Sequence, residues 1–333
     1  MNLFEESRWQ ESAAPYERLA RKALAAYGIE EPRLDLVSCE RQVLYRVSDP
    51  ETRTSYALRL YPSGWDRGQI LRTLFWLAAL RREARLLVPE PVLTRTGELV
   101  QSLSTPGVSG FRQTAMLSWV SGQRLPEWTA TQACDVGRLI GKMHEQTKMF
   151  ELPGELALKL REPDALDERI DPVRLSRTVA PEEEALLIDA ADRVRRATST
   201  LGTAADVAGL IHANLTPEHV VFEDDAACAI GFTGCRWGYY AYDLATMGRS
   251  LRDRENGDEL RSRLLEGYEE VRPLPPGFAN HRSAFAALRV LDELRTVATS
   301  IALEPADAED RRARRLIDAL REIVDAPAPS TEE

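Results

Sequence analysis

The feature that most constrains the fold is a change of hydrophobic periodicity along the chain. Residues 34–47 and 54–61 alternate apolar and polar side chains, which is typical of strands, and a turn-like segment at 48–51 separates them into a predicted hairpin. After residue 125 the apolar residues recur mostly at helical spacing. Strands gathered in one part of a chain and helices in the other predict an α+β fold.

Further elements follow from the same patterns. Gly28 ends an amphipathic helix predicted over 14–27, and Pro89 follows a strong helix predicted over 68–86. Short strands are predicted in two parts of the chain, and helices fill most of the rest. The remaining predicted strands are 91–101, 113–119, 219–223 and 227–232, and the remaining predicted helices are 129–147, 181–201, 242–253, 257–270, 281–302 and 308–324.

This order of elements predicts a bilobal molecule. We expect a small β-rich N-lobe with an N-terminal helix over 1–118, a hinge at 119–125 and a larger helical C-lobe over 126–325. The tail at 326–333 is rich in Pro, Ser and Glu and is expected to be frayed.

The charge balance argues against some classes of partner. Lys and Arg number 43 against 53 Asp and Glu, a formal net charge of −10, and an acidic chain is a poor nucleic-acid binder. The longest apolar run, 74–80, is far shorter than the roughly 20 residues that span a bilayer. The N-terminus has no signal-peptide pattern and the four cysteines form no CxxC pair. We therefore expect a cytoplasmic protein with no nucleic-acid partner and no membrane partner.

The segment richest in chemical information is 210–232. A polar loop, HANLTPEH at 212–219, precedes two short apolar strands that flank the acidic turn at 223–225. A loop carried by strands is a common position for catalytic and binding residues, so we expect the functional site here.

A set of short motifs carries a family resemblance. The chain reads His-Ala-Asn-Leu-Thr-Pro-Glu-His from residue 212, then Ile-Gly-Phe from 230 and Tyr-Asp-Leu-Ala from 242. This order resembles the aminoglycoside phosphotransferase and choline-kinase-like family, which reads H-G-D-L-H-P-x-N, then I-D-F, then Y-D-L-A. WVSGQRL at 119–125 is similar to the family's hinge, and the resemblance extends over roughly residues 20–300. It implies the bilobal protein-kinase fold.

The departures from the family pattern fall on the positions that the resemblance makes catalytic. Active members use a carboxylate to accept the substrate's hydroxyl proton, and an Asn and an Asp to hold Mg²⁺ on the nucleotide. The matching residues here are Asn214, His219 and Gly231. An amide takes no proton at neutral pH, a glycine has no ligating side chain, and a neutral imidazole is a poor ligand for Mg²⁺. The sequence therefore predicts no confident catalytic residue and no metal ligand.

Other positions of the family are kept or partly kept. The resemblance implies that His212 and Asp243 support the loop backbone. In the N-lobe it places the phosphate-anchoring base at Arg59, while the acidic partner of that base falls near Thr73, so the ion pair is expected to be absent. The candidates for a ligand or nucleotide cleft are Arg59, Glu40, Arg41 and Trp119.

Three functional hypotheses follow. The first is a catalytically inactive member that binds an unidentified small molecule or protein partner, with no confident cofactor. The second is an active ATP-dependent small-molecule phosphotransferase with displaced catalytic groups, which needs ATP and Mg²⁺ and has Glu218 as its nearest acidic residue. The third is a structural partner protein that uses the helical C-lobe. Plainer alternatives stay open as well, with His219 an ordinary hydrogen-bonded residue and Asn214 a partner of loop backbone groups.

Overall fold

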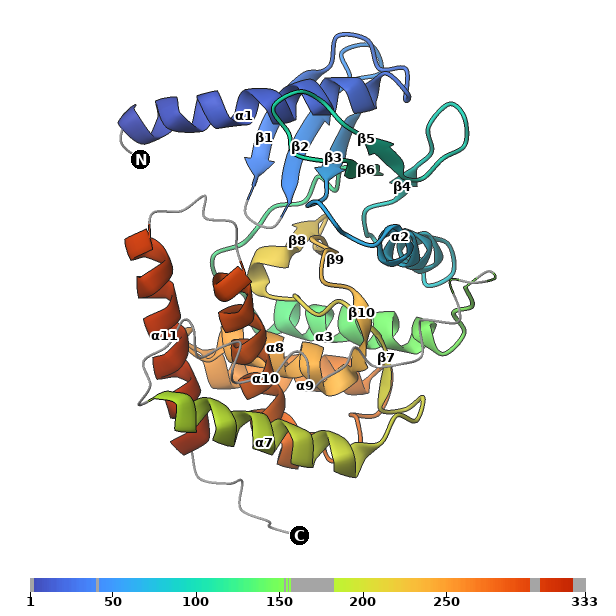
Figure 1. Cartoon of the computed structure of the whole chain (residues 1–333). Helices are drawn as coiled ribbons and strands as arrows, with labels where there is room; N and C mark the ends of the chain where they lie inside the picture. The colour runs from blue at the N-terminus through green and yellow to red at the C-terminus, as the bar shows by residue number, and fades with distance from the viewer. Residues whose placement is uncertain are drawn as a thin grey trace. The chain divides into compact units, whose positions relative to one another are not determined.

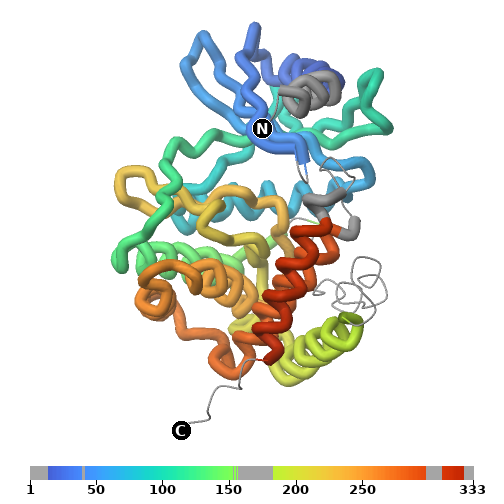
Figure 2. The backbone as a smooth tube through the Cα atoms, turned by 90° about the vertical axis from the view of Figure 1, so that its left-hand side faces the viewer, coloured from blue at the N-terminus to red at the C-terminus, as the bar shows by residue number. Residues whose placement is uncertain are grey.

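The computed structural model describes residues 3–39, 42–152, 154, 156, 183–299 and 306–325, with side chains described from residue 14 onward except at 298–299 and 306–309. The chain divides into two units. Unit 1 comprises Met1–Arg82 and Val88–Ser121, and unit 2 comprises Glu83–Leu87 and Gly122–Glu333. Figures 1 and 2 show the course of the chain through each unit. The unit boundary after Ser121 falls within 119–125, where a hinge remains a prediction.

Unit 1 contains an antiparallel sheet in the order β1-β2-β3-β6-β4, with a short β5 paired to β6. Its strands are β1 Arg33–Ser38, β2 Val43–Ser48, β3 Ser55–Leu60, β4 Pro91–Val92, β5 Gln101–Leu103 and β6 Arg112–Ser118. The predicted hairpin is wrong in one respect, because the stretch 34–47 forms two strands of a meander rather than one. The polar run SCERQ at 38–42 interrupts the apolar alternation, which explains the division.

Two helices accompany this sheet in unit 1 (Figure 1). The first, α1 Leu3–Leu24, begins well before the predicted residue 14 and buries Leu19 and Leu24 in one cluster with Leu58 of β3. Full burial of a leucine side chain contributes about 1.5–3 kcal/mol, so this cluster fixes the helix to the sheet. The second, α2 Arg67–Arg82, ends four residues short of the predicted helix.

Unit 2 is mainly helical, and the predicted separation of strands from helices is thereby confirmed. The α-helices described there are α3 Ala130–Thr147, α7 Glu184–Leu201, α8 Tyr240–Leu251, α9 Gly257–Glu269, α10 Phe278–Thr299 and α11 Ala306–Asp325. The helix α10 lies against α7, α8 and α11, while α3 lies against α9. Since α10 contacts three other helices, it lies in the core of the unit.

Two short antiparallel strand pairs lie among these helices. The pair β8 Val220–Glu223 and β9 Ala226–Ala229 matches the strands predicted at 219–223 and 227–232 to within a few residues. The pair β7 Ala208–Ile211 and β10 Arg236–Tyr239 was not predicted. Four-residue segments such as AGLI are too short to carry a period that separates strand from helix.

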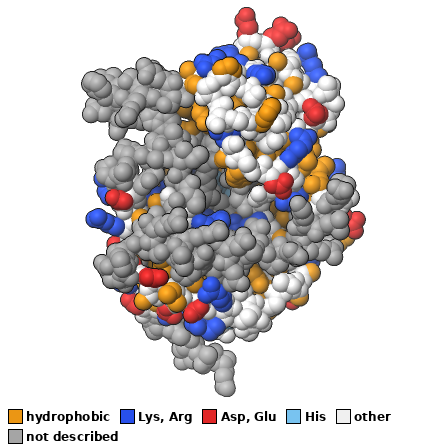
Figure 3. All heavy atoms as spheres, in the orientation of Figure 1, with side chains coloured by type: hydrophobic (Ala, Val, Ile, Leu, Met, Phe, Trp, Pro, Cys, Tyr) orange, Lys and Arg blue, Asp and Glu red, His pale blue; other side chains and the backbone are white. Residues whose placement is uncertain are grey.

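The helix surfaces of unit 2 are polar. On α7, Arg193 lies 3.1 Å from Asp189 and Arg195 lies 2.8 Å from Asp192. Figure 3 shows acidic and basic side chains interspersed over this part of the molecule. Such exposed pairs contribute only about 0.3–0.5 kcal/mol each, so the apolar core carries the stability of these helices. Among the helices that the structure describes, none is long and apolar enough to cross a membrane.

Candidate functional site

The loop predicted to be functional connects β7 to β8 in unit 2. It begins at His212, directly after β7, and ends in a short 3₁₀ helix, Pro217–His219, from which β8 continues. Pro217 stands at the start of that turn, where its fixed φ suits a helical conformation and its missing N–H leaves no bond unmade. The first turn of α8 supplies Asp243 to the same loop.

Asp243 holds the start of the loop by its backbone. The side chain is fully buried, and its two carboxylate oxygens accept the N–H groups of His212 and Ala213, each at 2.8 Å. Ala213 has a φ of +60°, in the left-handed region that costs an L-residue roughly 1–2 kcal/mol. The two hydrogen bonds therefore keep a strained backbone turn in place.

A buried histidine of α3 completes the support of Asp243. His144 Nε2 lies 3.3 Å from Asp243 Oδ2, and His144 Nδ1 lies 3.1 Å from the Tyr268 hydroxyl. Because a carboxylate only accepts, Nε2 carries the hydrogen and Nδ1 accepts from Tyr268. Burial lowers the pKa of His144, so its ring stays neutral. Burial by itself would raise the pKa of Asp243, but the hydrogen bond from His144 brings that pKa below its usual value, so the carboxylate is ionised.

His212 bonds the loop to the segment directly after β9. Its Nε2 donates to the Ile230 carbonyl at 2.8 Å, and its Nδ1 accepts the Asn214 N–H at 3.3 Å. The ring packs at 4.5 Å from the ring centre of Phe232 and is fully buried. Both ring nitrogens are engaged with backbone groups, so His212 shapes the loop and has no nitrogen left for a ligand.

Asn214 is held by an arginine of α10. Arg289 Nη2 donates to Asn214 Oδ1 at 2.8 Å, and Arg289 Nη1 donates to the Ala213 carbonyl at 3.3 Å. Glu293 pairs with the same guanidinium at 2.6 Å, and Arg289 is only 8% exposed. The side-chain oxygen of Asn214 is therefore bonded to a buried cation. Sequence reasoning missed Arg289, because it lies 75 residues from Asn214 and belongs to no local motif.

His219 and Gly231 fit against each other. Gly231 has a φ of +77°, and a Cβ placed on it would overlap Cδ2 of His219. The imidazole therefore fills the space that a side chain at position 231 would need. Thr216 Oγ1 lies 3.2 Å from His219 Nδ1. Burial, assisted by the nearby charge of Arg289, lowers the pKa of His219 to about 3, so the ring is neutral near pH 7.

The three residues at the catalytic positions do not fit a magnesium ion. Mg²⁺ takes oxygen ligands in an octahedral arrangement. His219 offers a neutral nitrogen, Gly231 offers no side chain, and the Asn214 oxygen is bonded to Arg289. In the part of the chain that the structure describes, no group of three or more His, Cys, Asp and Glu side chains is placed to hold a metal ion.

The acidic residues close to the loop in sequence lie at its exposed end and in the turn between β8 and β9. Glu218 is exposed, and its carbonyl accepts Arg124 Nε at 2.9 Å. Asp224 and Asp225 are exposed and form the turn between β8 and β9, with φ values of +47° and +65°. A base in that turn lies a whole strand away from Asn214, whereas proton transfer needs hydrogen-bond distance.

The candidates in unit 1 lie at different points of its sheet. Arg59 is 3% exposed on β3 and pairs in register with Ala115, while the Trp119 N–H donates to the Ser55 carbonyl at 3.1 Å, at the other end of that strand. Thr73 is buried on α2, and its hydroxyl donates to the Gln69 carbonyl at 3.3 Å. Glu40 and Arg41 lie outside the described residues.

Solved structures with the same architecture define the class of fold. An amicoumacin kinase in complex with AMP-PNP, Ca²⁺ and Ami superposes with a TM-score of 0.78 at 19% identity, over 96% of each chain. A microcompartment-associated aminopropanol kinase superposes with a TM-score of 0.76 at 24% identity, over 92% of this chain and 95% of that one. The molecule has the protein-kinase-like fold, which confirms the fold expected from the resemblance.

The family follows from the sequence comparison. Residues 40–284 match the model of the phosphotransferase enzyme family, and the chain belongs to that family. The homoserine kinase of Azorhizobium caulinodans is 26% identical over 230 residues, which are 67% of each chain. The homoserine kinase of Rhizobium johnstonii is 30% identical over 238 residues, which are 70% of this chain and 68% of that one.

Proposed function

We propose that this protein is a ligand-binding member of the phosphotransferase family that does not transfer a phosphoryl group through Mg²⁺. The observation that carries the proposal is the joint replacement at Asn214, His219 and Gly231, with His219 packed into the space over Gly231. A proton acceptor and two metal ligands are the groups that such a transfer needs from the protein, and all three positions lack them.

The expected loss in the rate of transfer favours a binding function over weak residual catalysis. Loss of a general base costs about 10²–10⁴ in rate. Loss of the metal's charge stabilisation adds several kcal/mol to the barrier. Arg289 brings a positive charge to the loop, but it already bonds Asn214 and Glu293. Turning that guanidinium toward a phosphate would leave both of those partners unpaired.

The intact support of the loop favours binding over loss of all function. Asp243, His144 and His212 form a complete set of buried hydrogen bonds beneath the altered positions. A shaped loop without its transfer groups still presents backbone and side-chain polar atoms to a ligand. The proposed ligand is a small molecule, since the curated relatives and the structural neighbours are named as small-molecule kinases.

A second candidate function is an active ATP-dependent small-molecule kinase with displaced catalytic groups. It is favoured by the names of the two relatives described above, both homoserine kinases, and by the neighbour named as an aminopropanol kinase. In this function the exposed Glu218 has to accept the substrate's proton, because it is the acidic residue within the loop. The metal ligands then have to come from residues other than His219 and Gly231.

Calorimetric titration and a transfer assay separate the two functions. ATP is titrated with and without Mg²⁺, and transfer to homoserine and to aminopropanol is followed by phosphorus NMR. The first function predicts no transfer to either compound, and nucleotide affinity that is absent or independent of Mg²⁺. The second predicts Mg²⁺-dependent transfer that is lost in Glu218→Gln.

A triple variant serves as the matched control. Asn214→Asp, His219→Asn and Gly231→Asp together restore the pattern that the resemblance assigns to active members. Under the first function this variant, checked for folding by circular dichroism, gains Mg²⁺-dependent ATP binding that the natural chain lacks. Mg²⁺-dependent transfer by the natural chain would overturn the first function, whatever the triple variant does.

A further inference from the structure

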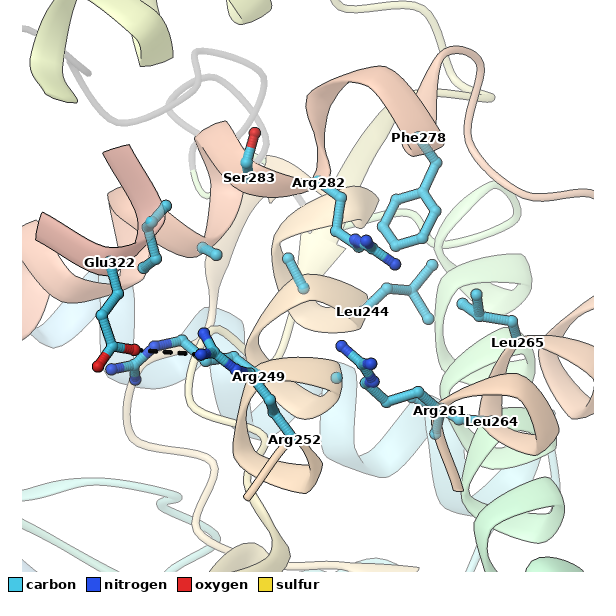
Figure 4. Close-up of a pocket in the computed structure, with 14 residues that line it drawn as sticks. Leu244, Arg249, Arg252, Arg261, Leu264, Leu265, Phe278, Arg282, Ser283 and Glu322 are labelled. Carbon is cyan, nitrogen blue, oxygen red and sulfur yellow. Dashed lines mark hydrogen bonds and ion pairs between the residues drawn. The ribbon is translucent and has the colours of Figure 1, made fainter. Parts of the chain in front are cut away.

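A pocket lies among four helices of unit 2, apart from the functional loop (Figure 4). It has a volume of about 160 Å³ and is bounded by α8, α9, α10 and α11. Leu244, Leu264 and Phe278 form an apolar wall, and all three are buried. The pocket contains none of the loop residues, although α8 and α10 also carry Asp243 and Arg289.

The polar side chains of this pocket are mostly arginines. Arg249, Arg252, Arg261 and Arg282 line it, against the single carboxylate of Glu322. Two of the guanidiniums have partners, because Arg252 lies 3.2 Å from Glu322 and Arg261 is paired with Asp258. No hydrogen bond or ion pair joins the guanidinium of Arg249 or of Arg282 to any residue that the structure describes.

The pocket is rich in positive charge, although the chain as a whole is acidic. The formal net charge is −10, yet the pocket presents four arginines over one lining carboxylate. Guanidiniums bind carboxylates and phosphates through paired hydrogen bonds, and they do so more strongly beside an apolar wall that excludes water. Figure 4 shows Arg282 beside Phe278, so a cation and an aromatic ring lie at the same cavity.

A glycine keeps the pocket open. Gly248 lies inside α8, where a glycine is less favourable than an alanine. A Cβ placed on Gly248 would meet no heavy atom within 4 Å, so no neighbouring side chain or backbone requires a glycine there. A larger side chain at this position would enter the cavity, because Gly248 is one of its lining residues.

We propose that this pocket binds a small organic anion, with an apolar body about the size of a benzene ring and one carboxylate or phosphate group. Apolar cavities of about 150 Å³ accept benzene, so the volume of 160 Å³ fits such a body. The anionic group bonds to Arg282, which lies beside Phe278 in Figure 4, and the body packs on Leu244, Leu264 and Phe278. The pocket and the loop share no residues, so this inference stands or falls separately from the proposed function.

Four probe compounds test the proposal on the full chain by calorimetry and by thermal unfolding. Benzoate and phenyl phosphate carry both the ring and the anion, benzyl alcohol carries the ring alone, and inorganic phosphate carries the anion alone. We expect at least one of the two ring anions to bind in the millimolar range or better, at least about tenfold more tightly than benzyl alcohol or inorganic phosphate. The stronger of the two ring anions identifies the class of anionic group.

Two variants locate the binding. Arg249→Gln combined with Arg282→Gln is expected to weaken the preferred ring anion at least about tenfold and to leave the affinity for benzyl alcohol unchanged. Gly248→Leu is expected to remove binding of every probe by filling the cavity, and Gly248→Val replaces it if the leucine variant fails to fold. Arg314→Gln, an exposed residue of α11 outside the lining, is the matched control and is expected to bind like the natural chain.

Three results would overturn the proposal. Failure of all four probes to bind at millimolar concentration overturns the proposal. So does equal binding of inorganic phosphate and the ring anions, because the apolar wall then contributes nothing. Binding that survives both the double arginine variant and the filled pocket places the anion elsewhere and overturns it too.

Discussion

The buried support of the functional loop and the chemical positions of the same loop differ in kind. Beneath the loop, Asp243 accepts hydrogen bonds from two backbone N–H groups and from one imidazole N–H, so each of these buried donors has an acceptor. On the loop itself, Asn214 is bonded to Arg289, and His219 fills the space over Gly231. The hydrogen bonds that support the loop are complete, while Asn214, His219 and Gly231 offer no carboxylate.

This difference teaches that loop shape and loop chemistry have separate physical requirements. The shape depends on satisfying buried polar groups, since an unpaired buried donor or acceptor costs about 1–3 kcal/mol. The chemistry depends on a carboxylate and on metal ligands, which add nothing to that satisfaction. The metal-binding positions can therefore be filled by a packed imidazole without any loss of the fold.

The largest expected effect comes from removing the support. Asp243→Ala leaves the N–H groups of His212 and Ala213 and the Nε2–H of His144 without an acceptor in a fully buried place. Breaking such a buried network costs about 3–5 kcal/mol. The free energy of unfolding, measured by urea denaturation at neutral pH, should fall by that amount.

A matched control distinguishes the network from the loss of a charge. Asp253→Ala removes an exposed carboxylate after α8 and should change the free energy of unfolding by less than about 0.5 kcal/mol. Similar losses of unfolding free energy in the two variants would mean that the buried hydrogen bonds of Asp243 contribute no more to stability than an exposed carboxylate does.

The next effect concerns the fit between His219 and Gly231. Gly231→Asp puts a side chain at a φ of +77° and into the space of the imidazole, so we expect a loss of about 2–4 kcal/mol. In a His219→Ala background that space is free, and the same change should cost about 1–2 kcal/mol less. A double-mutant cycle in urea measures the coupling directly. Strictly additive losses would show that the two residues do not compete for one space.

A third effect is the dependence of stability on pH. The pKa of His219 falls from its ordinary 6.5 to about 3 in the folded chain, mainly through burial. Between these values the unfolded chain binds one proton more than the folded chain. The stability that the folded chain gains from keeping this ring neutral is therefore fully present above pH 6.5. It is lost as the pH falls toward 3, at up to about 1.4 kcal/mol per pH unit. The lowered pKa of His144 acts in the same direction.

The measurement is a series of urea denaturations between about pH 5 and 6.5, above the range where carboxylates titrate. His219→Asn should reduce the slope of the unfolding free energy against pH by about one proton. Asn280→Ala, which changes an exposed residue of α10 that carries no titrating group, provides the control and should keep the slope of the natural chain. Identical slopes in the natural chain and in His219→Asn would contradict the half-buried, neutral state of this ring.

The sequence predicted the parts of this arrangement that lie in contiguous stretches. Hydrophobic periods and motifs such as HANLTPEH at 212–219 and the Asp243 motif indicated the α+β fold and the family, both of which the comparisons confirm. His144 and Arg289 received no specific role, because their partners Asp243 and Asn214 lie 99 and 75 residues away. Contacts over such distances depend on how the helices pack, which a single sequence does not reveal.

Two other features lay beyond sequence reasoning for a local reason. The β7–β10 pair consists of four-residue strands, whose pairing is visible only once β10 has folded back along β7. The fit of His219 against Gly231 depends on a positive φ, which a glycine permits but does not require. The residue types at both positions were clear from the sequence, whereas their contact was not.

The smallest effect tests whether the support holds the loop against backbone strain. Ala213 is in the left-handed region at a φ of +60°, where a glycine carries no penalty, but a glycine also has more freedom to lose on folding. The two terms partly cancel, so Ala213→Gly should raise the free energy of unfolding by only about 0.5 kcal/mol. Ala226→Gly, at an exposed position of β9, relieves no left-handed strain and should lower the free energy of unfolding by about 0.5–1 kcal/mol. Opposite signs in urea denaturation would show that strain at Ala213 is real and is borne by Asp243; a loss in both variants would mean that the turn is relaxed and that its support has no strain to oppose.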